Sequence, residues 1–155
     1  MIRTRVASSE DANEVSLIRD IGFATVRDTY TPNHGAVPMA LHASSYRCDI
    51  LADIDGFTAG VVSTAIEGAT LRISGLTVAP EIRRLGVARA LIASAECLAA
   101  NAHCSNVRLF TIRETGNVSL FGRLGFHFVD ETIADWCSSS RFDTLHEVQM
   151  EKLCG

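Results

Sequence analysis

The chain has 155 residues, and its 14 Lys and Arg stand against 18 Asp and Glu, which gives a formal net charge of −4. The length fits one domain with a complete hydrophobic core, so we expect a single domain over residues 1–155. The acidic balance excludes a general attraction to nucleic acid or to an anionic membrane surface. No apolar run has the length of a membrane span, and the N-terminal residues lack the apolar core of a signal peptide.

The chain contains five cysteines, an odd number without a C-x-x-C pair, which fits neither a disulfide framework nor a structural zinc site. The histidines also show no metal-ligand spacing with cysteines or acidic residues, so we expect no bound metal. Reduced thiols are typical of the cytoplasm, and the sequence therefore predicts a cytoplasmic protein.

Apolar and polar side chains alternate from Ile2 to Ala7, which predicts a first strand. Residues 8–11 (SSED) supply a hydroxyl cap and two acids, the usual start of a helix. Prolines and a glycine then interrupt residues 25–46, where only Met39–Ser45 has a helical composition. This connection contains Tyr30, a candidate for the wall of a substrate pocket. The first helix is expected to turn four residues toward the core: Val15, Ile18, Ile21 and Phe23.

Two turns divide the next part of the chain into three strands. Asp55-Gly56 separates Cys48–Ile54 from Phe57–Ile66. Glu67-Gly68 then leads into a strand from Thr70 to Val78. The pattern predicts an antiparallel meander.

The stretch from Leu71 to Ala102 is the most informative part of the sequence. Pro80 ends its apolar strand, because proline has no N–H for a sheet ladder. Residues 83–88 (RRLGVA) form a short loop, and a helix rich in Ala and Leu follows. Five residues spaced by three or four are expected on the buried face of this helix: Val87, Leu91, Ala95, Leu98 and Ala102.

This strand–loop–helix unit is suited to binding an anion. The first turn of a helix has N–H groups without intrahelical partners and a partial positive charge. Gly86 and the small Ala88 let the backbone approach a ligand closely. Arg83, Arg84 and Arg89 add positive charge around the same turn. The loop is therefore a candidate site for a diphosphate.

The remainder of the chain supplies further strands and a short helix. Val107–Ile112 follows the long helix, and such a crossover makes its pairing with the preceding strand parallel. A short helix begins near Asn117 and ends at Gly125, a left-handed cap. Phe126–Glu131 and Leu145–Lys152 are the expected last strands. The loop between them contains Trp136, a second candidate for the pocket wall, and three consecutive serines.

The loop Arg83-x-x-Gly86-x-Ala88 resembles the pyrophosphate-binding signature of the GNAT superfamily of acetyl-CoA-dependent N-acetyltransferases. As in that family, Leu76-Thr77-Val78-x-Pro80 precedes it. The likeness continues in the second half of the chain, and it leaves only residues 25–46 and 132–144 unassigned. The residues that carry it there are Asn117, Phe121, Leu124-Gly125-Phe126 and Met150-Glu151-Lys152.

The resemblance implies an α/β (α+β) fold with a curved mixed sheet flanked by helices, whose two central parallel strands splay apart to admit acetyl-CoA. Leu76–Val78 would bind the pantetheine arm like an added strand. Backbone amides from Arg84 to Arg89 would hold the diphosphate, and Asn117 with Phe121 would line the far wall. The implied CoA-binding residues are Leu76, Thr77, Val78, Arg83, Arg84, Leu85, Gly86, Val87, Ala88, Arg89, Asn117 and Phe121.

The implied reaction is direct attack of a primary amine on the thioester, with backbone N–H groups near Val78 stabilising the oxyanion. The chain departs from the family twice. The strand before the loop has Arg72 and Ser74 instead of a glutamate, so Ser74 is the candidate for positioning a water. Phe121 replaces a proton-donating tyrosine. General acid–base catalysis contributes roughly 10² to 10⁴ in rate, so we expect a slower or differently assisted enzyme.

Two other functions fit parts of the sequence. A catalytically silent acyl-CoA-binding or sensor protein fits the residue at position 121 and the missing glutamate. A dinucleotide-binding oxidoreductase fits only the glycine loop, because no G-x-G-x-x-G run is present. The acceptor, a small-molecule or peptide amine, stays open because its pocket falls in the unassigned segments. A homodimer through the outer strands is expected.

Overall fold

A computed structural model describes residues 1–35, 46–83 and 86–154. Within them, a seven-stranded mixed sheet has the order β1-β3-β4-β5-β6-β9-β7, and β2 pairs with β8 in a separate two-stranded sheet. The predicted α/β class with a mixed sheet is confirmed. The strands are β1 Ile2–Val6, β2 Thr31–Pro32, β3 Tyr46–Ile54, β4 Phe57–Glu67, β5 Thr70–Val78, β6 Asn106–Ile112, β7 His127–Ile133, β8 Cys137–Ser138 and β9 His146–Leu153.

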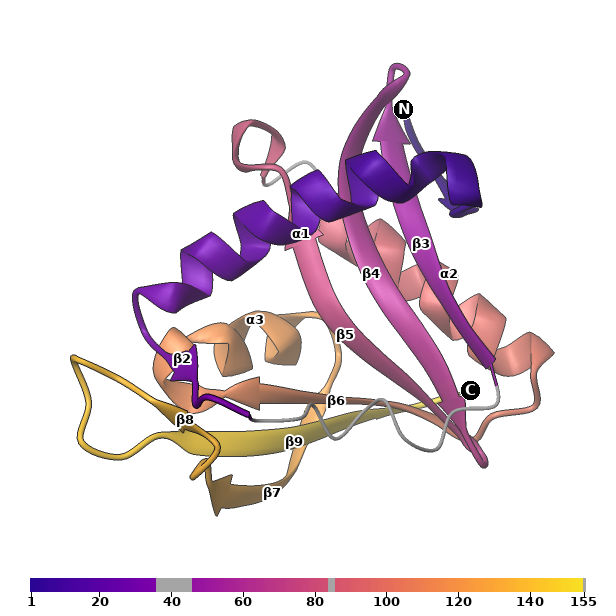
Figure 1. Ribbon diagram of the computed structural model, residues 1–155. Coiled ribbons are helices and arrows are strands. Elements are labelled where there is room, and N and C mark those ends of the chain that lie inside the picture. The colour runs from indigo at the N-terminus through magenta and orange to yellow at the C-terminus, as the bar shows by residue number, and fades with distance from the viewer. Residues whose placement is uncertain (36–45, 84–85, 155) are drawn as a thin grey trace.

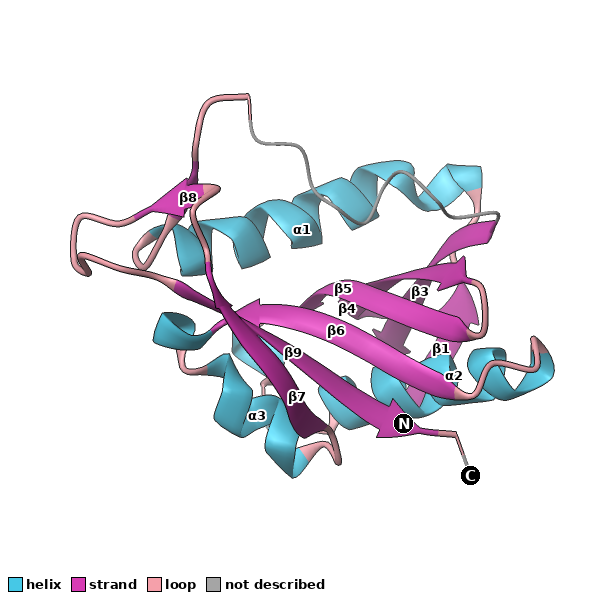
Figure 2. Ribbon diagram, turned by 90° about the horizontal axis from the view of Figure 1, so that it is seen from below, coloured by secondary structure: helices cyan, strands magenta, loops and turns pink. Residues whose placement is uncertain are grey.

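Helices cover both faces of the large sheet. Helix α1 lies on one face, whereas α2 and α3 lie on the other (Figures 1 and 2). The helices are α1 Ala12–Arg27, α2 Val87–Asn101 and α3 Asn117–Arg123, with short 3₁₀ turns at Ser9–Asp11, Pro80–Ile82 and Arg113–Thr115. None of the helices in the described part of the chain is long and apolar enough to cross a membrane.

The main core lies between the sheet and α2 with α3. Because side chains alternate along a strand, Arg72, Phe110 and Glu147 lie on the opposite face, on the side of α1. The core-facing neighbours that fix this alternation are Leu71 and Ile73 of β5, Val107 and Leu109 of β6, and Val148 and Met150 of β9, all of which are buried.

The buried stripe of α2 differs from the predicted one at its C-terminal end. Val87, Leu91 and Ala95 are buried as expected. The stripe then continues to Ala99, whereas Leu98 is partly buried and Ala102 is exposed. This stripe of α2 therefore keeps a spacing of four residues throughout. The prediction was wrong at the point where it used a spacing of three, from Ala95 to Leu98.

Helix α1 buries Val15 and Ile18, but the expected burial of two further residues is wrong. The exposed fractions are 38% for Ile21 and 49% for Phe23. Gly22 takes the third position on the sheet side, because its spacing from Val15 and Ile18 continues the stripe. A Cβ at Gly22 would collide with Oγ1 of Thr77. The missing side chain lets α1 lie close to β5, and Ile21 and Phe23 flank the contact.

We expect Gly22→Ala to destabilise the protein by about 1 to 3 kcal/mol, because the added methyl overpacks the contact with Thr77. The matched control is Gly122→Ala in α3, where an added Cβ meets nothing within 4 Å. That change should stabilise by about 0.5 to 1 kcal/mol, the usual gain of Ala over Gly in a helix. Chemical denaturation measures both; equal effects would contradict the packing argument.

Several turn predictions are confirmed. Asp55 and Gly56 both have positive φ, 49° and 84°, in the two-residue turn between β3 and β4. Gly125 has φ 97° after α3, and the Phe126 N–H donates to the Phe121 carbonyl at 3.0 Å, the long hydrogen bond of a left-handed cap. The predicted helical segment Met39–Ser45 lies outside the described residues.

The two unassigned segments contact each other after α1. The Asn33 N–H donates to the Trp136 carbonyl at 2.8 Å, alongside the pairing of β2 with β8. The rings of Tyr30 and Trp136 meet edge to face with centroids 5.8 Å apart. Both candidate wall residues therefore lie in one cluster, which sequence patterns did not predict.

Candidate active site

The two central parallel strands separate after a short ladder. β5 pairs with β6 only from Thr70 to Arg72, opposite Asn106 to Arg108. Beyond this point β6 stays paired with β9 as far as Ile112, and β5 continues away from it (Figure 1). The predicted splay is confirmed. It leaves backbone groups of β5 without a neighbouring strand on that side, where an extended ligand can bind.

A bulge in β5 lies where the strands diverge. Ser74 and Thr77 pair with Ser63 and Val61, so Gly75 and Leu76 together face one residue of β4. Gly75 has φ 61°, the left-handed geometry of a glycine bulge. The Thr77 hydroxyl donates to the Gly75 carbonyl at 3.1 Å. The bulge therefore changes the direction of β5 at the start of the gap, just where the predicted pantetheine-binding residues begin.

The N-terminus of α2 lies behind the same part of the sheet. Gly86 caps the helix with φ 86°, a conformation that favours glycine, and its carbonyl accepts the Ala90 N–H at 3.0 Å. Val87 and Leu91 pack where Gly60 of β4 leaves room. Arg84 and Leu85 lie outside the described residues. The helix end thus presents its unpaired N–H groups beside the gap.

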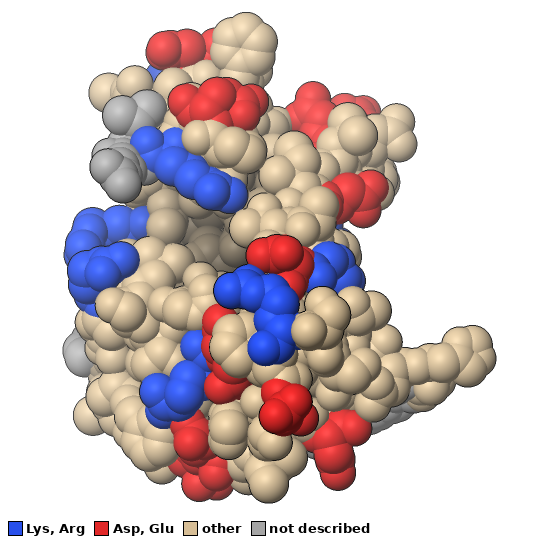
Figure 3. Space-filling model, turned by 90° about the vertical axis from the view of Figure 1, so that its left-hand side faces the viewer, with Lys and Arg blue, Asp and Glu red and all other residues tan. Residues whose placement is uncertain are grey.

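Helix α3, the predicted far wall of the gap, contacts β6, the strand on the other side of the gap from β5. The Arg89 guanidinium donates to the Arg123 carbonyl at 3.4 Å and so links α2 to α3. Phe121 is 9% exposed and meets Phe126 edge to face at 6.0 Å. Figure 3 shows the side where β5 and β6 diverge; it is hollowed, with basic and acidic side chains around the hollow.

The α1 side of the sheet carries a desolvated arginine. The Arg72 side chain is 14% exposed, and its guanidinium lies 4.4 Å from the centroid of the Phe110 ring. Glu67 is its nearest acid, 3.8 Å away, which is too far for a hydrogen bond. Burial lowers the pKa of Arg72. Its neighbour Ser74 is exposed on the same face.

Glu147 of β9 lies on this face beside Ile112. Burial raises the pKa of its carboxyl, and the Trp136 side chain and the Arg72 charge partly offset the rise. Ile112 belongs to a small apolar cluster with Tyr30 and Trp136. Sequence reasoning missed Glu147, whose position in an alternating strand is typical of a solvated side chain.

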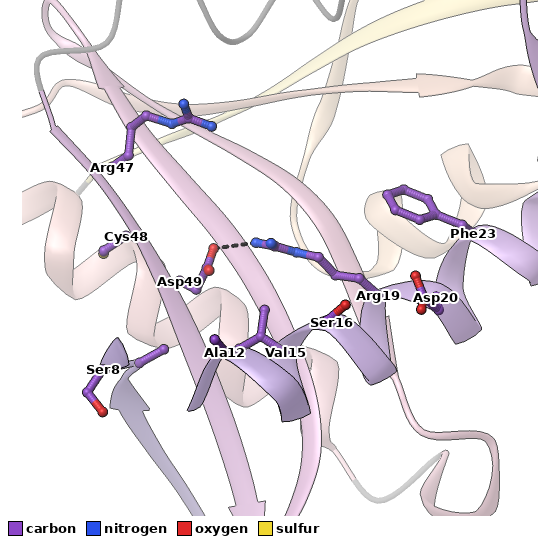
Figure 4. A pocket seen from close by; sticks show the side chains of 11 residues that line it. Ser8, Ala12, Val15, Ser16, Arg19, Asp20, Phe23, Arg47, Cys48 and Asp49 are labelled. Atoms are coloured by element: carbon purple, nitrogen blue, oxygen red, sulfur yellow. Dashed lines mark hydrogen bonds and ion pairs between the residues drawn. The ribbon is translucent and has the colours of Figure 1, made fainter. Parts of the chain in front are cut away.

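Two surface cavities lie on the α1 side. One of about 450 Å³ lies between α1 and β3, where Arg19 pairs with Asp49 (Figure 4). None of the predicted site residues lines it. The other, about 340 Å³, lies beside Tyr30 and Ser138–Ser140. Within residues 1–35, 46–83 and 86–154, no group of three or more His, Cys, Asp or Glu gathers as a metal site.

The family model of the acetyltransferase (GNAT) domain matches residues 36–142, more than half of the chain. The chain belongs to the GNAT acetyltransferase family. The uncharacterized protein YdhI of Bacillus subtilis (strain 168) is 26% identical over 118 residues, which cover 70% of this chain and 71% of that protein. The predicted acyltransferase class is thus confirmed by the family.

Solved GNAT structures share the whole fold. Nourseothricin acetyltransferase has a TM-score of 0.73 at 19% identity, with 99% of both chains covered. A putative streptothricin acetyltransferase from Bacillus anthracis str. Ames, in complex with acetyl coenzyme A, also has a TM-score of 0.73, at 13% identity and with 99% of both chains covered. The predicted GNAT fold is confirmed; the individual CoA-binding residues stay predictions.

Proposed function

We propose that this GNAT protein transfers the acetyl group of acetyl-CoA directly to a primary amine. The observation that carries the proposal is the β5–β6 ladder, which ends at Arg72, so that β5 runs on without a neighbour on that side to Thr77, near which the N-terminus of α2 packs. The diphosphate binds the first turn of α2, and the pantetheine arm runs along Leu76–Val78. The thioester then reaches through the gap, and the amine approaches it from the face that α1 covers.

The reaction forms a C–N bond and breaks the C–S bond of the thioester. Backbone N–H groups after the β5 bulge, near Val78, stabilise the oxyanion of the tetrahedral intermediate. The acceptor ammonium must first lose a proton, because only a neutral amine attacks. Phe121 cannot protonate the departing sulfur, but a thiol with a pKa of about 8.5 leaves readily as a thiolate and takes its proton from water.

Calorimetric titration of acetyl-CoA, desulfo-CoA and NADH into the protein tests the donor half of the proposal. Binding of both CoA compounds and not of NADH is the expected result. A screen of amines for free-thiol release then separates an enzyme from a silent acyl-CoA-binding protein. NADH binding without CoA binding would favour the dinucleotide-binding alternative, and no CoA binding by folded protein would refute the donor site.

Phe121→Tyr is expected to raise kcat by about 10-fold or more, because a phenol beside the gap can protonate the leaving thiolate. The matched control is Phe126→Tyr, since the two rings pack against each other and both are buried. That hydroxyl lies in the core and should lower stability without raising kcat. The free-thiol assay measures both. An unchanged kcat in Phe121→Tyr argues that water suffices as the proton source.

We also propose a homodimer and a cytoplasmic location, each on an observation of its own. All seven residues of the edge strand β7 are exposed, including Phe128, Val129 and Ile133. An exposed apolar edge of this kind supports the expected homodimer. All five cysteines are free, which supports a cytoplasmic location. The acceptor is a small-molecule or peptide amine.

A further inference from the structure

Arg72 is withdrawn from water without a hydrogen bond to any described residue. Its Nε is buried and has no partner. Arg108, its neighbour in register, differs: its Nε donates to Oε1 of Glu151 at 2.9 Å, and its Nη2 lies 2.8 Å from the same oxygen. A desolvated donor without a partner is costly, and Glu67, 3.8 Å from Nη1, supplies a charge but no hydrogen bond. The Arg72 guanidinium can therefore still bind an anion. A planar guanidinium fits a carboxylate with two parallel hydrogen bonds.

Glu147 supplies the opposite charge on the same face. The register of β6 and β9 puts it beside Ile112, two residues beyond the Phe110 ring on which Arg72 stacks. The two charges influence each other's pKa, yet among the described residues they form no ion pair within 4.0 Å. The Phe110 ring lies on the sheet between them, and the Tyr30–Trp136 pair lies on the Glu147 side. The face therefore offers a cationic and an anionic position that do not neutralise each other.

We propose that Arg72 and Glu147 form the acceptor subsite and that the acceptor is an amino carboxylate. Its carboxylate binds the Arg72 guanidinium, and its ammonium lies at the Glu147 carboxylate. This inference rests on the proposed acetyl transfer and names its acceptor class.

Glu147 takes one proton from the ammonium and passes it to water. The neutral nitrogen then attacks the thioester carbonyl, the C–N bond forms and the C–S bond breaks. The second nitrogen proton reaches the thiolate through water, so one amide, one free thiol and one released proton result. Burial of Glu147 supports this role, because a raised pKa brings a carboxyl closer to the operating pH of a general base.

The first test compares acceptors on the unmodified protein. A panel of α-, β- and γ-amino carboxylates is assayed for free-thiol release beside the same amines without the carboxyl group, for example phenylalanine with phenethylamine and histidine with histamine. For at least one pair, kcat/KM should be about 100-fold higher for the carboxylate, as for a site built to bind one polar group. Equal or better use of the carboxyl-free amine in every pair, or no acetylated amino carboxylate, would overturn the inference.

The second test compares Arg72→Gln with Arg108→Gln, which removes the same charge from a paired neighbour. Arg72→Gln should lower kcat/KM for the amino carboxylate about 10- to 100-fold more than for the carboxyl-free amine and leave the acetyl-CoA affinity unchanged. Arg108→Gln should leave the preference between the two amines unchanged. Equal losses on both amines in Arg72→Gln would assign Arg72 a structural role.

Arg72→Lys guards against misfolding, because it retains the charge and should lose less of the carboxylate preference than Arg72→Gln. Titration of acetyl-CoA separates the two levels of argument. No acetyl-CoA binding by the unmodified protein counts against the proposed function. Intact acetyl-CoA binding and turnover without the carboxylate preference count against this inference alone.

Discussion

Gly86→Glu is expected to weaken acetyl-CoA binding about 100-fold or more. Gly86 caps α2 with φ 86°, so a side chain there is strained, and it would stand at the turn that we propose binds the diphosphate. A carboxylate at this turn repels the diphosphate and competes for the same N–H groups. Isothermal calorimetry with acetyl-CoA measures the loss. Unchanged affinity would remove the N-terminus of α2 from the donor site.

Two controls separate charge from backbone strain. Gly86→Asn introduces a residue that tolerates positive φ and carries no charge, so this variant should lose much less acetyl-CoA affinity than Gly86→Glu. Gly56→Glu places the same side chain at almost the same φ, 84°, in the turn between β3 and β4, where nothing lies within 4 Å. We expect its acetyl-CoA affinity to equal that of the unmodified protein. A loss in Gly56→Glu would attribute the effect to instability.

The sequence predicted best those features that a short stretch of chain determines by itself. The Asp55-Gly56 turn and the Gly125 cap depend on positive φ, which few residues other than glycine adopt. The orientation of α1 was predicted wrongly at Ile21 and Phe23 for a physical reason. Hydrophobic periodicity counts apolar side chains. It cannot detect the close contact between α1 and β5 at Gly22, which is possible because glycine has no side chain.

The same limit divides the candidate site. Its donor half is one continuous segment, from the β5 bulge to the first turn of α2, and a sequence motif can represent it. Its acceptor half combines Arg72, Phe110 and Glu147 from three strands with Trp136 from a loop. In sequence Glu147 alternates with buried residues and is typical of a solvated face. Only the pairing of β6 with β9 brings it next to Ile112.

Glu147→Gln is expected to lower kcat about 100-fold or more near neutral pH, because the amide cannot accept the ammonium proton. In the unmodified protein kcat should rise with pH as the Glu147 carboxyl ionises, at a pKa above the ordinary value of 4.5, since burial raises it. The groups that face this carboxyl are Arg72 from β5 and Trp136 from the loop before β8, and its charge also reaches Tyr30 and Cys137. The pH–rate profile of Glu147→Gln should lack this rise; a profile that keeps it assigns the proton to another group.

Glu147→Gln should also change stability, and in the opposite direction to its effect on kcat. A carboxyl whose pKa is raised in the folded state binds its proton more tightly there, so the contribution of Glu147 to stability is fully present below pH 4.5 and is lost as pH rises through the folded pKa. At neutral pH the ionised Glu147 therefore costs stability, and Glu147→Gln should raise the free energy of unfolding.

Glu151→Gln, on the same face of β9, is the matched control. Burial raises the pKa of Glu151, but the hydrogen bond and charge of Arg108, together with hydrogen bonds from Asn106 and Gln149, outweigh this and hold the pKa below its usual value. Ionised Glu151 therefore stabilises the fold above the ordinary pKa, and this substitution should lower stability at neutral pH while leaving the pH limb of kcat in place. A residue kept only for packing would not combine lost turnover with gained stability. Chemical denaturation and pH–rate profiles of the two variants, taken together, distinguish a proton acceptor from a structural acid.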